Sequence, residues 1–293
     1  MSVRNLRSFK FNKIFTFLLL FSSFFISCVK SKEKKDAQSS SLKELKILNV
    51  ARSADPRTLD PQAQFDQGSS MFISNVYDTL LDYHYLKRPY ELVPSLLEKM
   101  PEVSKDGMTY TFILRKGIFF LEDACFKDKK KRELNADDVL YTMKRFADAR
   151  INNLSWFLLD GIVEGLNDFR KKTSKEAKFT KDYKTVAVSG LKKLASHSFQ
   201  VKLTRKNKLF MYALATSSLS IIPKEAVDHY GRKFGRHPVG TGPFRLAEYE
   251  KKQKMELIKN PDYFLSYPSE NGPDNKTLLI DKDKKLPLVD EVH

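Results

Sequence analysis

The side chains that could catalyse a reaction or hold a metal ion are few and widely spaced in this 293-residue chain. No two of its five histidines have the i, i+4 spacing that places two imidazoles on one face of a helical zinc site. The histidines are His84, His197, His229, His237 and His293. From this spacing we expect no metal site and no cofactor.

Nucleophilic catalysis has little support either. No Gly-x-Ser-x-Gly sequence, which is typical of a nucleophile elbow, occurs. Cys125 has no obvious partner base and is interpreted as a bystander thiol. The acidic pairs Glu122/Asp123 and Asp137/Asp138 are interpreted as turn and helix-cap residues. We therefore expect a protein that is not an enzyme and has no catalytic residues, with a hydrolase as a minor alternative.

The first residues are typical of an export signal rather than of a fold. Basic residues and no acidic ones precede Cys28, and an apolar run follows them at Ile14–Ile26. This run is shorter than the roughly 20 residues that span a bilayer, and it is typical of the apolar region of a signal peptide. We expect residues 1–27 to be a signal peptide.

Cys28 directly follows the apolar run. Its position resembles the bacterial lipobox, in which the cysteine is lipidated and becomes the new N-terminus; Ser27 fits that pattern, whereas Phe25 replaces the usual Leu. We expect a lipidated Cys28 and a polar tether over residues 28–45, with a secreted protein or an uncleaved anchor as alternatives. The chain has two cysteines, so a lipidated Cys28 would leave Cys125 without a cysteine partner. The mature chain would then have no intrachain disulfide.

The charge balance is strongly basic. The formal net charge is +16, and the first 27 residues contribute four positive charges, which leaves +12. Such a balance is compatible with nucleic acid binding, but export argues against that partner. The lysines are scattered, and the runs Lys127–Arg132 and Lys282–Lys285 are interpreted as solvated loops. Attraction to an anionic membrane surface is the simpler explanation.

The remaining chain alternates between strand and helix patterns. Residues 42–51 and 110–114 predict strands, and the second has apolar side chains at every other position. Ser69 or Ser70 is expected to cap a helix whose apolar face carries Phe72 and Val76 and extends to Leu80.

Three further elements follow. Asn135 is expected to cap a helix with acidic residues in its first turn, where they complement the positive helix end. The buried stripe of this helix is Val139, Met143 and Phe146. Residues 199–203 predict another strand. Pro223 is expected to open a short helix that Gly231 closes.

A strand hairpin is predicted over His237–Phe264. Gly240 and Gly242 are expected to take backbone angles that other residues avoid, and Pro243 fixes the start of the first strand. The Gly-Thr-Gly sequence is not followed by a helix with Lys-Ser/Thr, so a phosphate loop is not expected.

Seven motifs in order resemble one family. They are "TLDP", "NVYDTLLDY", "LVPSLLEKMPEVSKDGMTYTFILRKGIFF", "LNADDVLYTMKRFAD", "IIPKEAV", "PVGTGPFRLAEY" and "KNPDYF", between Ala51 and Phe264. This order is similar to the N-terminal part of the bacterial extracellular solute-binding proteins of family 5, the peptide/nickel-type receptors of ABC importers.

The resemblance implies an α/β fold, the first lobe of a periplasmic-binding-protein-like structure. A mixed sheet with flanking helices would take residues 46–77 and 194–293, with an inserted α+β subdomain at 78–193. The second lobe would be absent, because the chain ends at His293. On this basis we expect a truncated protein that binds ligand weakly or not at all by itself.

The implied function is capture of oligopeptides, or of a related small solute, between two lobes and delivery to ABC permease subunits. The protein would lie in the cell envelope, periplasmic or on the outer surface, attached to the membrane through its lipid anchor, without nucleic acid. The alternatives are a surface interaction or adhesion lipoprotein and a non-functional remnant of a split gene.

The resemblance also implies three ligand contacts: a loop that pairs its main chain with an extended peptide, an aromatic residue and a third wall of the cleft. These contacts fall on Phe65, Asp66, Gln67, Trp156, Thr216 and Ser217. The alternatives are a plain surface loop at 65–67 and core packing for Trp156. Main-chain recognition needs an accessible strand edge rather than a specific side chain.

Overall fold

The computed structural model describes residues 44–52, 54–175, 183, 186–270 and 276–293. The expected signal peptide and Cys28 lie outside the described residues. Within the described part of the chain, no helix is both long enough and apolar enough to cross a membrane.

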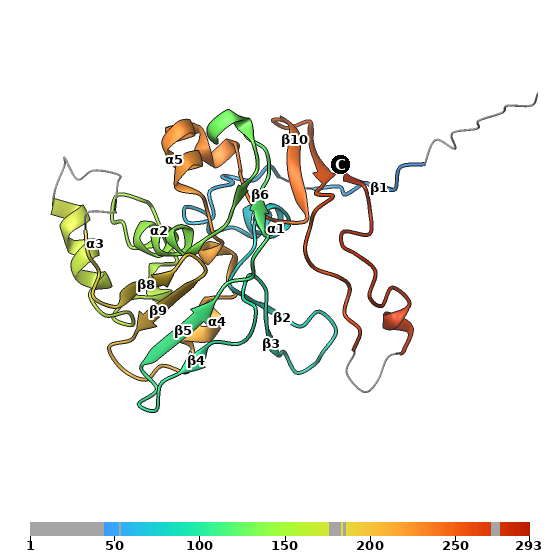
Figure 1. Cartoon of the computed structure of the whole chain (residues 1–293). Coiled ribbons are helices and arrows are strands. Elements are labelled where there is room, and N and C mark those ends of the chain that lie inside the picture. The colour runs from blue at the N-terminus through green and yellow to red at the C-terminus, as the bar shows by residue number, and fades with distance from the viewer. Residues whose placement is uncertain (1–43, 53, 176–182, 184–185, 271–275) are drawn as a thin grey trace, which may run out of the picture. The chain divides into compact units, whose positions relative to one another are not determined.

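One sheet joins segments from both ends of the described chain (Figure 1). Its four strands lie in the order β1-β12-β11-β10. The strands are β1 (Ile47–Leu48), β10 (Phe244–Glu250), β11 (Lys254–Lys259) and β12 (Glu291–Val292). β1 and β12 are parallel, whereas β12, β11 and β10 pair antiparallel, so the hairpin predicted from the sequence is confirmed.

A second four-stranded sheet has the order β4-β5-β9-β8 and is antiparallel throughout. Its strands are β4 (Glu102–Val103), β5 (Thr109–Ile113), β8 (Leu191–Ala195) and β9 (Ser198–Lys202). The predicted alternation is confirmed, because Phe112 and Phe199 are fully buried opposite one another with ring centroids 4.8 Å apart. β9 thus pairs with β5 of the segment that was expected to form the inserted subdomain. The boundary expected between residues 193 and 194 would separate these two strands.

Two short strand pairs and the helices complete the described chain. The pairs are β2 (Leu81–Tyr83) with β3 (Leu92–Pro94), and β6 (Phe119–Phe120) with β7 (Arg132–Glu133). The α-helices are α1 (Gln67–Val76), α2 (Ala136–Phe146), α3 (Leu166–Lys175), α4 (Phe210–Ala213) and α5 (Lys224–Tyr230). The short 3-10 helices include η2 (Trp156–Leu158), η4 (Ser217–Leu219) and η5 (Gly231–Arg236). Figure 1 shows α2 lying beside β8.

Helix α2 follows the sequence prediction closely. Asn135 accepts a hydrogen bond from the main-chain N–H of Asp137, and the Asp138 carboxylate accepts one from the N–H of Asn135, so the cap is reciprocal. The predicted stripe of Val139, Met143 and Phe146 is buried. Local signals are sufficient here, because the cap and the buried stripe lie within one helix.

Helix α1 begins earlier than predicted. Its cap is Asp66, which accepts hydrogen bonds from the main-chain N–H and the hydroxyl of Ser69, both 2.8 Å long. Ser69 is instead buried in the first turn. The predicted cap at Ser69 or Ser70 is therefore wrong, and the apolar face ends at Val76 rather than at Leu80, which lies beyond the helix.

Gly240 and Gly242 serve a different purpose from the one expected. Neither has the positive φ that would exclude other residues. A side-chain Cβ at Gly240 would lie 2.0 Å from the carbonyl oxygen of Val76, and one at Gly242 would lie 2.5 Å from the carbonyl carbon of Val76. Glycine is needed because the strand start passes directly against the end of α1, where the Gly242 N–H donates to the Val76 carbonyl.

Candidate functional site

The loop that precedes α1 is fixed to α2 by a buried ion pair. Nη1 and Nη2 of Arg145 lie 2.9 and 2.6 Å from the two carboxylate oxygens of Asp60. Gln62 accepts a further hydrogen bond from Arg145 and donates to the main-chain carbonyl of Thr142. Paired and fully hydrogen-bonded charges can be buried at acceptable cost, so residues 60–62 have a defined position from which the next residues project.

The three loop residues that were predicted to contact ligand lie at the start of α1. Phe65 is 65% exposed, and Gln67 is also exposed. Asp66 is the helix cap: burial raises its pKa, but the hydrogen bonds from Ser69 outweigh burial and hold the pKa below its usual value. The carboxylate is thus committed to the helix, whereas Phe65 and Gln67 are available to a ligand.

A hydrogen-bond network brings the predicted segments together. The side-chain amide of Gln64 donates to the hydroxyl oxygens of Ser217 and Ser218 at 3.3 and 3.0 Å. Ser217 also bonds to Ser70 of α1 at 2.9 Å, and Ser218 to Ser155 at 2.9 Å. The loop before α1, the segment of Trp156 and the start of η4 therefore meet, although they are far apart in the sequence.

Trp156 opens η2 next to Ser155 and is half-buried. Its ring lies 6.3 Å from that of Phe146, and the Arg170 guanidinium carbon lies 4.8 Å from its centroid. The ring thus packs partly on the core and partly under a cation. Thr216 does not join the network, because its hydroxyl donates to the Ala213 carbonyl within the preceding turn.

The network contains residues that the sequence reasoning missed. They are Gln64, Ser70, Ser155 and Ser218. Gln64, Ser155 and Ser218 are each the immediate neighbour of a predicted residue, so the segments were identified but the inward-facing members were not. No local signal distinguishes them, because which of two adjacent residues points inward depends on distant partners.

Exposed apolar side chains flank the buried polar ones. Phe65 follows Gln64, and Leu154 and Phe157 lie on either side of the Ser155–Trp156 pair; these three side chains are 54–67% exposed. Contiguous exposed apolar side chains are typical of interaction surfaces, and these three add exposed apolar area beside the network in the sequence. In the described part of the network, the serine hydroxyls bond to one another and to Gln64 rather than to a histidine or another base.

A separate hollow among the described residues lies elsewhere. It is a groove of about 1200 Å³ whose walls include Leu48, Val50, Met71, Phe244, Leu257 and Val292. None of the six predicted contacts lines it. Its walls are mainly apolar, whereas the predicted segments converge at the network of Gln64, Ser70 and Ser217. We therefore take the network rather than the groove as the candidate site.

Cys125 lacks the features of a catalytic thiol. Burial, together with the nearby carboxylate of Asp123, raises the pKa of the thiol well above its usual value. Asp123 accepts hydrogen bonds from Tyr230 and from the Cys125 N–H, and lies 3.0 Å from His237 Nε2. A thiol held protonated beside a carboxylate is a poor nucleophile.

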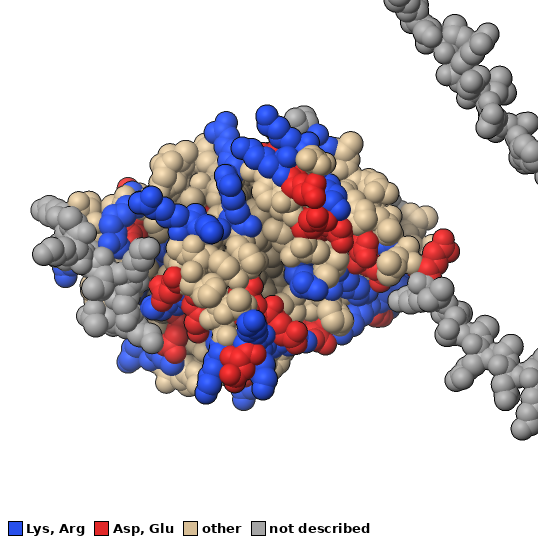
Figure 2. Space-filling model, turned by 90° about the horizontal axis from the view of Figure 1, so that it is seen from above, with Lys and Arg blue, Asp and Glu red and all other residues tan. Residues whose placement is uncertain are grey.

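The basic residues do not form a continuous patch on the face seen in Figure 2. Lys and Arg side chains are spread across this face, with acidic and uncharged residues between them. Many of the described lysines form ion pairs, such as Lys193 with Asp137 at 2.6 Å and Lys202 with Glu164 at 2.8 Å. The distribution on this face is that of a solvated surface.

Comparison with curated proteins finds peptide-binding proteins. The chain is 31% identical over 237 residues to the dipeptide-binding protein of Escherichia coli (strain K12), covering 77% of this chain and 39% of that protein. It is 32% identical over 205 residues to the peptide transport periplasmic protein SapA of Salmonella typhimurium, covering 67% and 33%. The chain thus spans well under half the length of these relatives.

Solved structures agree in fold. The periplasmic binding protein DppA of Helicobacter pylori, in complex with the peptide STSA, superposes with a TM-score of 0.57 at 27% identity, covering 75% of this chain and 41% of that one. The unliganded open form of the murein tripeptide binding protein MppA has a TM-score of 0.64 at 17% identity, covering 85% and 41%. The predicted α/β fold of a periplasmic binding protein lobe is confirmed.

The match to the family itself covers most of the chain. Residues 91–293 match the bacterial extracellular solute-binding proteins, family 5 Middle. The motif order, the hairpin that closes the first sheet and the fold of the solved relatives agree with this match. The chain belongs to the bacterial extracellular solute-binding proteins of family 5.

Proposed function

We propose that this chain forms one wall of the binding cleft of an ABC-importer receptor that captures oligopeptides. The observation that carries the proposal is the convergence of three distant segments through Gln64, Ser155 and Ser217. The peptide-binding relatives support the ligand class. Because the chain spans about two-fifths of their length, the activity of a whole receptor is part of the proposal.

Capture would be reversible and without covalent chemistry. The main chain at Phe65–Gln67 would pair with an extended peptide, and the exposed Phe65 and the half-buried Trp156 would contact its side chains. Ser217 and the turn at Thr216 would form the third wall. Main-chain pairing gives affinity without demanding one peptide sequence, which suits a receptor for mixed peptides.

The site would belong to a two-part lobe. A sheet domain would be built from residues 46–77 and 194–293, with residues 78–193 as an inserted subdomain. Lobe closure would remove peptide from water and present it to permease subunits. A signal peptide over residues 1–27 and a lipid on Cys28 would hold the protein in the cell envelope.

Photo-crosslinking tests the location of the site. The probe is a tetrapeptide that carries benzoylphenylalanine, irradiated with the chain and mapped by mass spectrometry. We expect crosslinks in fragments that contain Phe65, Trp156 or Ser217, and we expect unlabelled peptide to compete for them. Crosslinks confined to the groove at Met71 and Leu48, or labelling that no peptide displaces, would overturn the assignment.

The alternative of a surface interaction lipoprotein makes a different prediction. Binding of a polyanion to a chain with a net charge of +12 after signal removal should weaken steeply with salt. Peptide held by main-chain hydrogen bonds should change little between about 50 and 500 mM salt. Crosslinking yield measured across this range distinguishes the two functions.

A further inference from the structure

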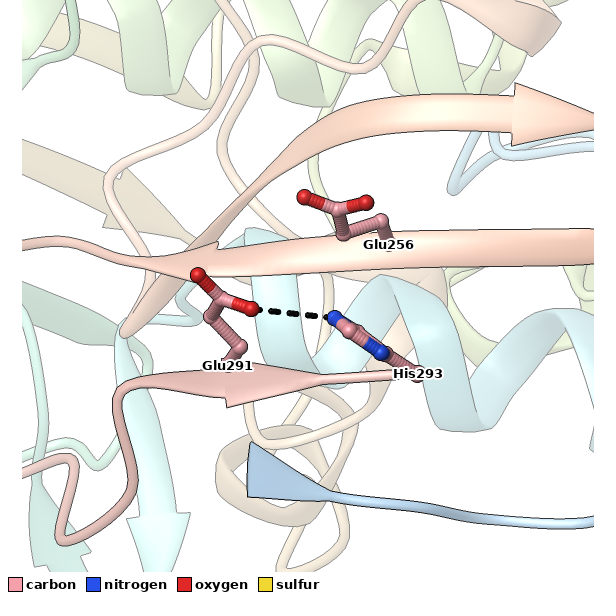
Figure 3. Close-up of side chains that lie close together, drawn as sticks. All are labelled: Glu256, Glu291 and His293. Atoms are coloured by element: carbon pink, nitrogen blue, oxygen red, sulfur yellow. Dashed lines mark hydrogen bonds and ion pairs between the residues drawn. The ribbon is translucent and has the colours of Figure 1, made fainter. Parts of the chain in front are cut away.

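Three ligand-type side chains meet on one face of the β11–β12 pair. The register pairs Leu257 with Val292 and Ile258 with Glu291, so the next position of the antiparallel ladder places Glu256 opposite His293. Glu291 lies two residues before His293, and side chains two apart share a face of a strand. Figure 3 shows Glu256 on β11, with Glu291 and His293 on the neighbouring strand segment.

The donor atoms are close enough to share one ion. One carboxylate oxygen from each glutamate and one imidazole nitrogen lie within 4.8 Å of one another. Nε2 of His293 lies 3.0 Å from Oε2 of Glu291. Ligand atoms about 2.0–2.2 Å from a common centre are separated by roughly 3–4 Å, so small side-chain rotations would bring the three onto one ion.

The surroundings concentrate negative charge at this point. Glu248 of β10 lies opposite Glu256 in the neighbouring register, so carboxylates face one another across two strands. Like charges directly opposite in a sheet are destabilising. Lys254 compensates in part: its ammonium lies 2.5 Å from Glu248 but 3.8 Å from Glu256. Glu256 and Glu291 are left with less compensation, which a divalent cation would supply.

We propose that Glu256, Glu291 and His293 bind one first-row divalent cation of the Zn²⁺ class. An imidazole with two carboxylates is a donor set that suits Zn²⁺, and it leaves a fourth position for water. The side chains of Glu256, Glu291 and His293 are 27%, 21% and 36% exposed, so the ion can reach them from solvent. The inference does not depend on the proposed peptide function.

The ion would have a structural effect. β12 is only two residues long and is held between β1 and β11. An ion coordinated by Glu256 from one strand and by Glu291 and His293 from the next segment would cross-link β12 to β11. Sequence spacing could not reveal this set, because His293 and Glu256 become neighbours only through strand pairing.

Calorimetric titration of the tag-free chain with Zn²⁺, after EDTA treatment and dialysis, tests the proposal. We expect one ion per chain. Glu256→Gln and His293→Ala should each weaken binding at least tenfold, because each removes one of three ligands. Replacement by Co²⁺ should give visible absorption bands typical of low coordination number, and Glu256→Gln should abolish them.

A matched pair elsewhere on the chain provides the control. His197 Nε2 lies 3.2 Å from Glu133, and this pair belongs to no cluster of three ligand-type side chains among the described residues. His197→Ala and Glu133→Gln should leave Zn²⁺ binding unchanged. If these variants lose as much affinity as Glu256→Gln, or if wild type binds no Zn²⁺ at millimolar concentration, the proposal is overturned.

Lys254 provides a test in the opposite direction. Lys254→Gln removes the cation that competes for the carboxylates and should tighten Zn²⁺ binding severalfold. Because this variant gains affinity, the result cannot be attributed to misfolding. Unchanged or weaker binding by Lys254→Gln would contradict a site centred on Glu256.

Discussion

Arg145 of α2 holds Asp60 with two hydrogen bonds, from Nη1 at 2.9 Å and from Nη2 at 2.6 Å, although the residues are 85 positions apart. Only 8% of the Arg145 side chain and 11% of the Asp60 side chain are exposed. This pair fixes the loop that leads to Gln64 and Phe65. The candidate site therefore depends on a buried contact that none of its own side chains makes.

Removing one partner of this pair should be costly. Asp60→Ala leaves the guanidinium buried without its ionic partner, and we expect the free energy of unfolding to fall by about 3–5 kcal/mol. Urea denaturation followed by circular dichroism measures the change. Lys99→Ala breaks an exposed pair with Glu102 and should have little measurable effect; an equally small effect of Asp60→Ala would contradict the buried role.

Gly240 should be intolerant of even one methyl group. Gly240→Ala places Cβ 2.0 Å from the Val76 carbonyl oxygen, a main-chain atom that cannot rotate away. We expect a loss of about 2–3 kcal/mol, in the upper range for overpacking. Thermal unfolding measures it.

Gly117 is the control for this substitution. It has a φ of +72°, and no atom lies within 4 Å of the position that a Cβ would take there. Gly117→Ala should therefore cost only the backbone strain, about 1 kcal/mol. If Gly117→Ala is as destabilising as Gly240→Ala, close approach to α1 is not the reason for glycine at position 240.

The sequence predicted best those elements whose cap or buried face is encoded within the element itself. The cap at Asn135 and the alternation through Phe112 are local, and both were predicted correctly. The start of α1 was not, because Asp66, Ser69 and Ser70 are all good caps, and only the hydrogen bonds that Asp66 accepts from Ser69 distinguish them. The pairing of β1 with β12 and the contact of Gln64 with Ser218 depend on residues far apart, so no spacing in the sequence reveals them.

Asp78 should make stability depend on pH. Burial raises the pKa of its carboxyl to about 6, although Thr241 and Tyr263 donate hydrogen bonds to it at 2.6 and 3.0 Å. Between about pH 4 and 6 the folded state then holds a proton that the unfolded chain releases. The unfolding free energy should fall as pH rises through this window, by about 3 kcal/mol for a shift of this size.

Asp78→Asn isolates this contribution. The variant cannot titrate at position 78, so the difference in unfolding free energy between wild type and variant should change between about pH 4 and 6 and be constant outside this range. Urea midpoints at half-unit pH steps provide the measurement. Parallel profiles for the two proteins would show that Asp78 keeps an ordinary pKa.

Trp156 is the single tryptophan of the chain and can report on the proposed peptide site. As one wall of the proposed cleft, the described site is expected to bind peptide weakly. Titration with a defined mixture of di- to tetrapeptides to millimolar concentration should shift the tryptophan emission. A signal that salt abolishes, or no shift at any concentration, would contradict capture at this site.

Ser217→Ala tests whether the hydrogen-bond network positions Ser217 as the third wall of the proposed cleft. The variant removes the hydroxyl that accepts from Gln64 and bonds to Ser70. The loss of about 0.5–1.5 kcal/mol lowers the stability of the free and the bound chain alike, so peptide binding should weaken by at most roughly tenfold. Ser74→Ala is the matched control, because its exposed hydroxyl donates only to the Met71 carbonyl in the same helix. The peptide-dependent emission shift should be weakened by the first substitution and unchanged by the second. Equal emission shifts in the two variants would mean that Ser217 does not shape the cleft. Unfolding measurements on both variants show separately whether either substitution lowers stability.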